Sequence, residues 1–234
     1  MEKRNVLKFG FLSLAVLASA CFAPSASASV IGHLTFVNCD GGGVTVTITT
    51  VTWLPPATVG TGCIAAGFET NVTFAGAPGA ISPAEHGTIN DLAPLSGNTG
   101  FISFPGVTFD AGLIGPGVSN LACSAVMATG PACSVLLNSP FILTPGAAGT
   151  VITLGVSGLA NDASSHNSPW SGIFSTQIAN ETPKQIQDAF NAAGSFTATY
   201  SFDGNVGIPE PVSLALIGGG LVALAGLKRR KARS

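Results

Sequence analysis

The chain has 234 residues, of which 46% are hydrophobic and 9% are charged, and its formal net charge is −2. That length allows one sizeable domain or two small ones. Of the nine lysines and arginines only Lys184 lies between residues 29 and 208, where nine acids against one lysine give a net charge of −8. A segment with a single cation offers no basic patch for phosphates, which argues against a nucleic-acid-binding protein.

Residues 1–28 are predicted to be a secretory signal peptide. A basic stretch precedes a short apolar run, and Ala26-Ser27-Ala28 provides a small-x-small cleavage site. An uncleaved anchor is disfavoured because the apolar run is too short to span a bilayer and is followed by the helix-breaking Pro24. A lipoprotein signal at Cys21 stays open as an alternative, although Leu17 stands one position too early for the usual lipobox.

Residues 29–207 are predicted to form an extracytoplasmic β-sandwich domain. Between Gly43 and Thr49, aliphatic residues alternate with threonines, a pattern typical of a half-buried strand. The run from Leu34 to Val37 precedes this strand across an Asp40-Gly41 step, so we expect the two to pair as a hairpin. The alternation shifts its phase at Thr50-Val51, which predicts a β-bulge.

Further short β-rich runs, separated by glycine and proline, extend this pattern along the chain. They are residues 71–74, 88–92, 101–104, 107–109, 135–137, 141–144, 151–156 and 196–202. The polar stretch from Asn161 to Asn167 is instead expected to be a solvated loop. Short strands at this spacing predict an all-β fold, a β-sandwich of which the jelly roll is one variant.

One short helix is predicted after residue 182. Thr182 can cap it, Pro183 stands at its first position, and Gln185 completes a capping box. Gly194 follows where a left-handed residue ends a helix. The apolar stripe that includes Ile186 predicts that the helix covers a sheet edge or an open end of the sandwich.

The domain contains an even number of cysteines, which predicts disulfide bonds rather than free thiols. They are Cys39, Cys63, Cys123 and Cys133. Four cysteines allow three pairing schemes, and we favour the one that joins nearest neighbours across turn-rich stretches, with disulfides 39–63 and 123–133. Each disulfide would stabilise the domain by about 3 kcal/mol. A zinc site is the competing interpretation, but no C-x2-C pair occurs, and the three histidines lie at none of the usual intervals.

No motif in the domain predicts catalysis or a cofactor. The acids are scattered singly, and the nearest match to a nucleophile elbow, Gly155-Val156-Ser157-Gly158, is one residue too short. Structural calcium stays open, although Asp203-Gly204-Asn205 is an isolated fragment that we expect to be a turn. Trp53, Trp170 and Tyr200 could stack on sugars, but buried aromatics are commoner in a sandwich. We therefore predict no catalytic residue, no metal ligand and no enzyme activity.

The C-terminal segment, residues 208–234, has the pattern of a membrane anchor. Val212–Leu227 carries no charge and would extend about 24 Å as a transmembrane helix, marginally enough to insert. A basic cluster follows it at once: Lys228, Arg229, Arg230 and Lys231. Such a cluster holds the end of the chain in the cytoplasm and leaves the domain on the far side of the membrane.

The order of Ile208-Pro209-Glu210-Pro211, apolar segment and basic end resembles the PEP-CTERM sorting domain. The resemblance implies recognition of Pro209, Glu210 and Pro211 by an exosortase, a membrane-embedded, cysteine-dependent transpeptidase-like enzyme that cuts near this element. The exported domain is similar, through Leu34–Cys39 and Trp53-Leu54-Pro55-Pro56, to a group of such proteins of unknown function, and that similarity implies no activity.

Together these features predict an exported, non-enzymatic protein. It would be anchored in the membrane through its C-terminus before processing and would then be found at the cell surface or outside the cell, in association with the surface or an exopolysaccharide matrix. The alternative is an extracellular carbohydrate-binding module, which exposed aromatics in a row would favour. A secreted hydrolase, which would need two converging carboxylates, comes third.

Overall fold

The computed structural model describes residues 29–39, 42–54, 56–58, 61–93, 95, 97–164 and 167–207. The predicted signal peptide, sorting motif and C-terminal anchor lie outside these residues. Within the described part of the chain, no helix combines the length and apolar character that a membrane span requires. The division into residues 1–28, 29–207 and 208–234 therefore stays a prediction.

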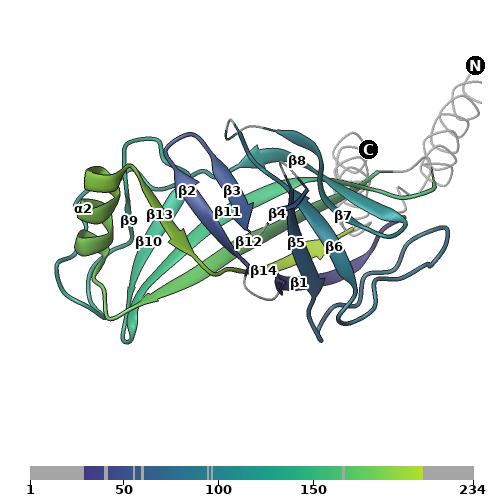
Figure 1. Cartoon of the computed structure of the whole chain (residues 1–234), viewed down its shortest axis with the longest axis horizontal. Helices are drawn as coiled ribbons and strands as arrows, with labels where there is room; N and C mark the ends of the chain where they lie inside the picture. The colour runs from purple at the N-terminus through teal and green to yellow at the C-terminus, as the bar shows by residue number, and fades with distance from the viewer. Residues whose placement is uncertain are drawn as a thin grey trace, which may run out of the picture. The chain divides into compact units, whose positions relative to one another are not determined.

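The described residues form fourteen strands and one helix (Figure 1). The strands are β1 (Gly32–Asn38), β2 (Gly43–Thr47), β3 (Val51–Leu54), β4 (Pro56–Thr58), β5 (Thr61–Ala66), β6 (His86–Asn90), β7 (Asn98–Phe104), β8 (Val107–Ile114), β9 (Cys133–Ser134), β10 (Phe141–Gly146), β11 (Gly149–Asn161), β12 (Ser168–Ala179), β13 (Ser195–Ala198) and β14 (Ser201–Val206), and the helix is α2 (Pro183–Ala193). The prediction of an all-β fold with one short helix is confirmed for this part of the chain.

Eight strands form a closed, barrel-like sheet. Their order is β12-β14-β1-β5-β6-β7-β8-β11, and the pairing of β11 with β12 joins the two ends. β11 and β12 form a long hairpin in register from Gly149 opposite Ala179 to Ala160 opposite Ser168. Closure leaves no free edge among these eight strands where they pair, which removes the sites at which strands of other chains would add.

The long hairpin extends beyond the closed sheet toward α2. Residues 156–161 of β11 pair with β8, whereas residues 149–154 pair with β10, which in turn pairs with β9. A separate sheet, in the order β13-β2-β3, faces this extension. Figure 1 shows α2 at one end of the described domain, beside β9, β10 and β13. The predicted sandwich is thus found only where the three-stranded sheet faces β10, β11 and β12.

The predicted hairpin between the first two strands is wrong. β1 pairs with β14 and β5, while β2 pairs with β3 and β13 in the other sheet. The chain changes direction between β1 and β2, and Asn38 contributes to this turn. Its Nδ2 donates to the carbonyls of Cys39 at 3.0 Å and Gly42 at 2.9 Å. The Cys39–Cys63 disulfide also holds the end of β1 against β5. The chain therefore leaves the first sheet after Asn38 and enters the other sheet at Gly43.

Two other local predictions are corrected. The Thr50-Val51 bulge is a tight turn between β2 and β3, closed by a 2.9 Å hydrogen bond from the Thr47 N–H to the Thr50 carbonyl. The single strand expected over residues 196–202 is divided into β13 and β14, because the chain passes from one sheet to the other at Tyr200. The Tyr200 ring packs there against Trp53, with ring centroids 4.6 Å apart.

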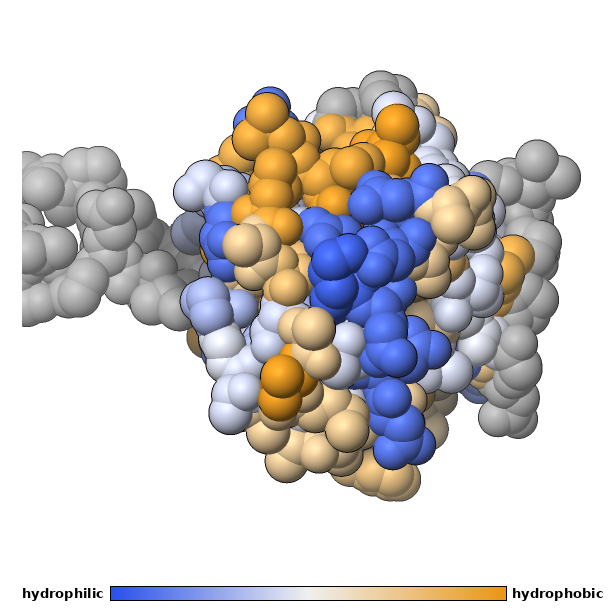
Figure 2. Space-filling view, turned by 90° about the vertical axis from the view of Figure 1, so that its left-hand side faces the viewer, coloured by the Kyte–Doolittle hydropathy of each residue, from blue (hydrophilic) through white to orange (hydrophobic). Residues whose placement is uncertain are grey.

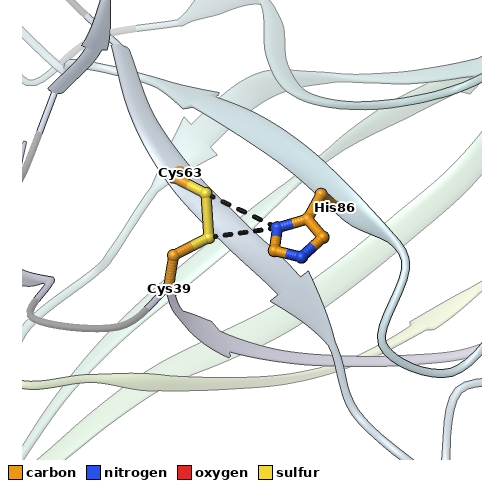
Figure 3. A group of neighbouring side chains, drawn as sticks. All are labelled: Cys39, Cys63 and His86. Atoms are coloured by element: carbon orange, nitrogen blue, oxygen red, sulfur yellow. Dashed lines mark hydrogen bonds between the residues drawn. A yellow bond between two sulfur atoms is a disulfide. The ribbon is translucent and has the colours of Figure 1, made fainter.

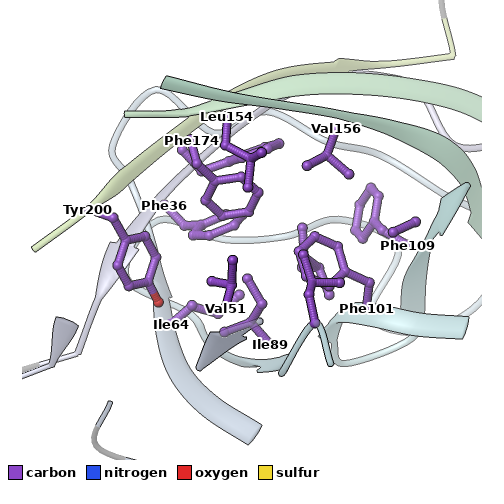
Figure 4. Close-up of a cluster of buried hydrophobic side chains, with 14 of the residues drawn as sticks. Phe36, Val51, Ile64, Ile89, Phe101, Phe109, Leu154, Val156, Phe174 and Tyr200 are labelled. Carbon is purple, nitrogen blue, oxygen red and sulfur yellow. The ribbon is translucent and has the colours of Figure 1, made fainter. Parts of the chain in front are cut away.

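The core combines aromatic with aliphatic side chains (Figure 4). Phe36 stacks on Phe202 with ring centroids 4.5 Å apart, and Phe174 lies 5.8 Å from Phe36. Trp53 reaches this cluster from the three-stranded sheet, 5.1 Å from Phe174. Because aromatic pairs contribute about 0.5–1.5 kcal/mol each beyond area burial, this cluster holds the two sheets together.

The predicted helix is confirmed with its caps. Thr182 accepts a hydrogen bond from the Gln185 N–H, and the Gln185 side chain accepts one from the Thr182 N–H. Gly194 ends the helix in the left-handed conformation, with φ of 72°. Ile186 and Phe190 are the buried members of the apolar stripe, so the helix covers the open end beside β10 and β13, as predicted.

Tyr200 provides a test of the core. Its hydroxyl is buried and has no hydrogen-bond partner among the described residues, and burial raises its pKa above the ordinary value. Tyr200→Phe removes this unpaired group, so we expect the free energy of unfolding to stay unchanged or to rise by about 1 kcal/mol in urea titrations.

Thr150→Val is the matched control. The Thr150 hydroxyl is also buried, but it donates to the Glu181 carbonyl at 2.7 Å, so removing it should destabilise the domain by about 1 kcal/mol. An equal loss of stability in both variants would contradict the unpaired state of the Tyr200 hydroxyl.

Candidate functional site

The sorting residues predicted from the sequence, Pro209, Glu210 and Pro211, lie outside the described residues, as does the basic cluster from Lys228 to Lys231. Their role stays a prediction. The four predicted disulfide cysteines are all described, and they pair as the sequence favoured. Cys39 bonds to Cys63 with Cα atoms 5.5 Å apart, and Cys123 bonds to Cys133 with Cα atoms 5.3 Å apart.

The first disulfide lies on the outer side of the closed sheet, at its β1–β5 pair. Asn38, the last residue of β1, pairs with Ile64, which brings the next residue, Cys39, opposite Cys63. The Cys39 N–H donates to the Cys63 carbonyl at 3.2 Å, so the backbone also ties the two together. Gly62 and Ile64 point into the core while Cys63 is half-buried, as strand alternation requires.

His86 stands beside this disulfide on the neighbouring strand (Figure 3). It opens β6 and pairs with Ala65 of β5, two residues along from Cys63 and on the same face. Its Nδ1 lies 3.5 Å from the Cys39 Sγ and 3.8 Å from the Cys63 Sγ. The ring is exposed, so one imidazole and two sulfurs meet at a solvent-facing position.

Sequence reasoning missed this group because the three residues lie far apart in the chain. His86 is 47 positions from Cys39 and 23 from Cys63, and neither interval belongs to a local metal motif. Only the pairing of β1 with β5 and of β5 with β6 brings them together. The alternation around Cys63 predicts its outward direction, but the register that places His86 beside it follows from the fold.

Four described carboxylates, those of Glu85, Asp91, Asp110 and Asp162, accept hydrogen bonds from backbone N–H groups, and Asp162 does so most extensively. Its two oxygens accept hydrogen bonds from the N–H groups of Ala75 and Ser164, each at 2.8 Å, and from the Ser29 hydroxyl at 3.3 Å. Partial burial alone would raise the pKa of Asp162, but the hydrogen bonds from Ser164, Ala75 and Ser29 together hold the pKa below its ordinary value. This carboxylate joins three loops.

Asp91, which directly follows β6, and Asp110, which lies inside β8, have similar roles. Asp91 accepts from the Trp53 N–H at 2.9 Å, which covers the free edge of β3. Asp110 accepts from the Gly100 N–H at 2.6 Å and from the Asn161 side chain at 2.8 Å. These acids complete the hydrogen bonding of the backbone, which is a structural use of carboxylates.

Other residues that the sequence singled out lie in the core or within strands. Trp53, Trp170 and Tyr200 are 2%, 4% and 6% exposed, so none of them presents a ring for sugar stacking. Asp203-Gly204-Asn205 lies inside β14, and the predicted turn there is wrong. Gly204 lets β14 pass close to the Phe202 ring, because a Cβ at this position would lie 2.6 Å from that ring.

An apolar cavity of about 30 Å³ lies between the two sheets, bordered by Trp53, Phe174 and Tyr200 together with aliphatic residues of β2, β3 and β11. A water molecule needs about 10–15 Å³ but also two to four polar partners, which these walls do not supply. The cavity is therefore a gap in the packing between the two sheets.

The end of the described domain that carries α2 has a mixed surface, with a hydrophilic band beside an apolar area (Figure 2). The segment from residue 121 to 137, which includes β9, is hydrogen-bonded to α2 through the Leu121 and Ser124 carbonyls. It exposes Leu121, Val126, Met127 and Leu137. Exposed apolar residues are ordinary on protein surfaces, so this grouping assigns no function by itself.

No family model, no curated protein and no solved structure matches this chain. Its function is therefore argued from its own residues.

The hydrogen bonds of Asp162 predict a pH dependence of stability. A lowered pKa in the folded state means that ionised Asp162 stabilises the domain above its unfolded pKa of about 3.9, and that this contribution is lost as the pH falls through the lower folded pKa. Asp162→Asn should therefore be less stable than the wild type at pH 7, and the difference should shrink below about pH 4.

Urea titrations of both proteins between pH 3 and pH 7 measure this difference. Glu69→Gln is the control, because Glu69 is exposed on a neighbouring loop, and its substitution should leave stability unchanged across this range. If the difference in the free energy of unfolding between wild type and Asp162→Asn were the same at every pH, the stabilising role of the Asp162 charge would be contradicted.

Proposed function

We propose that this protein is an exported, surface-sorted, non-enzymatic protein, processed by an exosortase-type machinery and associated with the cell surface or an exopolysaccharide matrix. The observation that carries the proposal is the pairing of all four cysteines of the described domain into two disulfides. Disulfides form and persist in oxidising compartments, outside the cytoplasm, and are rare within it. A domain with this cysteine arrangement fits export.

The distribution of charge supports the same proposal. The only cation among residues 29–208 is Lys184, and it forms an ion pair with Asp188 on α2. The remaining cations flank the two apolar terminal segments, where the positive-inside rule keeps them on the cytoplasmic side. An acidic middle between two such ends is suited to translocation, and its net charge favours solubility outside the cell.

The C-terminal residues supply the sorting step of the proposal. Pro209, Glu210 and Pro211 would be held extended by the two proline rings, accessible to a membrane-embedded exosortase. The apolar segment Val212–Leu227 would keep this element at the membrane, and the basic cluster from Lys228 to Lys231 would stop translocation.

The carbohydrate-binding alternative receives less support. Its strongest candidates for stacking on sugars are Trp53, Trp170 and Tyr200, and all three are buried in the aromatic core. The hydrolase alternative needs a pair of free carboxylates, whereas Asp91, Asp110 and Asp162 accept hydrogen bonds from backbone groups. A scaffold role, in which these residues stabilise the domain, accounts for their positions best.

The sorting proposal predicts the mass of the mature protein. Intact-mass measurement of protein recovered from the cell surface should show loss of residues 1–28 and of the segment that follows Pro211. Glu210→Ala should abolish C-terminal processing and leave the anchored form in the membrane, because the recognised carboxylate is missing. Glu181→Ala, which removes an acid near α2, should be processed normally. A wild-type surface protein that retains residues 212–234 would contradict the proposal.

A further inference from the structure

We propose that Cys39, Cys63 and His86 form a zinc-binding site when the Cys39–Cys63 disulfide is reduced, so that the disulfide and the zinc complex are alternative states of one site. The site belongs to the outer side of the closed sheet, and the inference does not depend on sorting or on attachment at the surface.

The distances around His86 already suit a metal ion. Zinc in a tetrahedral site binds sulfur at about 2.3 Å and nitrogen at about 2.1 Å, which places a nitrogen ligand about 3.6 Å from a sulfur ligand. The Nδ1 of His86 lies 3.5 Å from the Cys39 Sγ and 3.8 Å from the Cys63 Sγ. The imidazole therefore stands at the ligand spacing of a zinc site with respect to both sulfurs.

The two sulfurs have to move apart on reduction. In a tetrahedral zinc site they would be about 3.8 Å from each other. The Cα atoms are 5.5 Å apart on directly opposite positions, and rotation about the Cα–Cβ bonds changes the sulfur separation without moving the strands. The hydrogen bond from the Cys39 N–H to the Cys63 carbonyl, and the β5–β6 ladder, hold the backbone in place.

The chemistry balances with a dithiol as the reductant. The dithiol gives two electrons and two protons to the disulfide and becomes a disulfide itself, while Cys39 and Cys63 become thiols. Zinc binding then displaces the two thiol protons and uses the lone pair of neutral His86 Nδ1. Because His86 is exposed, the fourth coordination position faces solvent, and a water molecule can occupy it.

The second disulfide is a natural control. Among the described residues, the Cys123–Cys133 pair has no histidine or carboxylate in a comparable three-ligand group. The Ser134 carbonyl oxygen lies 3.7 Å from the Cys123 Sγ, and Cys133 is fully buried. Reduction of this pair yields two thiols without the third ligand that His86 supplies to the first pair.

The experiment compares zinc binding by the full chain and its variants after reduction with a phosphine, which competes for zinc less than a dithiol does. We expect one zinc ion per reduced wild-type chain in competition with a chromophoric chelator, and none in the oxidised protein. His86→Ala should weaken binding at least about tenfold, since loss of a group that merely supports a ligand already costs 10–100-fold. Cys39→Ser/Cys63→Ser, which retains the second pair and Cys21, should bind at least as weakly.

Cobalt substitution and circular dichroism complete the test. Cobalt added to the reduced wild type should give a thiolate-to-metal charge-transfer band that the Cys39→Ser/Cys63→Ser variant lacks. If reduction unfolds the chain, zinc should restore the β-sheet signal of the wild type and fail to restore that of His86→Ala. Equal zinc affinity in wild type and His86→Ala, or binding that persists in Cys39→Ser/Cys63→Ser, would overturn the proposal.

Discussion

The contact between Trp53 and the aromatic residues of the closed sheet is the interaction on which the described domain depends. Trp53 stands on β3 in the smaller sheet, yet its ring packs against Phe174 of β12 and against Tyr200 between β13 and β14. Its Nε1–H also donates to the Asn90 carbonyl of β6 at 2.9 Å. One side chain therefore connects both sheets, and truncation of a buried tryptophan typically costs about 3–5 kcal/mol.

Because the aromatic residues fill the inside of the closed sheet, its outer side carries the groups with chemistry. Strand alternation turns Cys39, Cys63 and His86 outward, and the two antiparallel pairings bring them together. Asp91 follows the end of β6 and Asp162 follows the end of β11, and both accept hydrogen bonds from backbone N–H groups. These two carboxylates thus support loop structure, while the sulfur and imidazole groups are the ones that the proposed zinc site uses.

The sequence predicts the features that short-range interactions determine. The caps of α2 depend on Thr182 and Gln185, three positions apart, and the nearest-neighbour disulfides close short loops. Prediction from the sequence fails where contacts between residues far apart in the chain determine the structure. β12 was missed because serines and glycine interrupt its alternation, although Trp170 and Phe174 point into the core and β11 pairs along its length. The proximity of His86 to the disulfide likewise follows from the strand order of the closed sheet, which no local pattern encodes.

Disulfide mapping of the protein recovered from cells tests the central claim, that this is an oxidised, exported domain with the fold described. Free thiols are alkylated first, the unreduced protein is digested, and the cross-linked peptides are identified by mass spectrometry. The account predicts peptides joined through Cys39–Cys63 and Cys123–Cys133, with none of the four cysteines alkylated. Alkylation of these cysteines in the cell-derived protein, or peptides joined through another pairing, would contradict it.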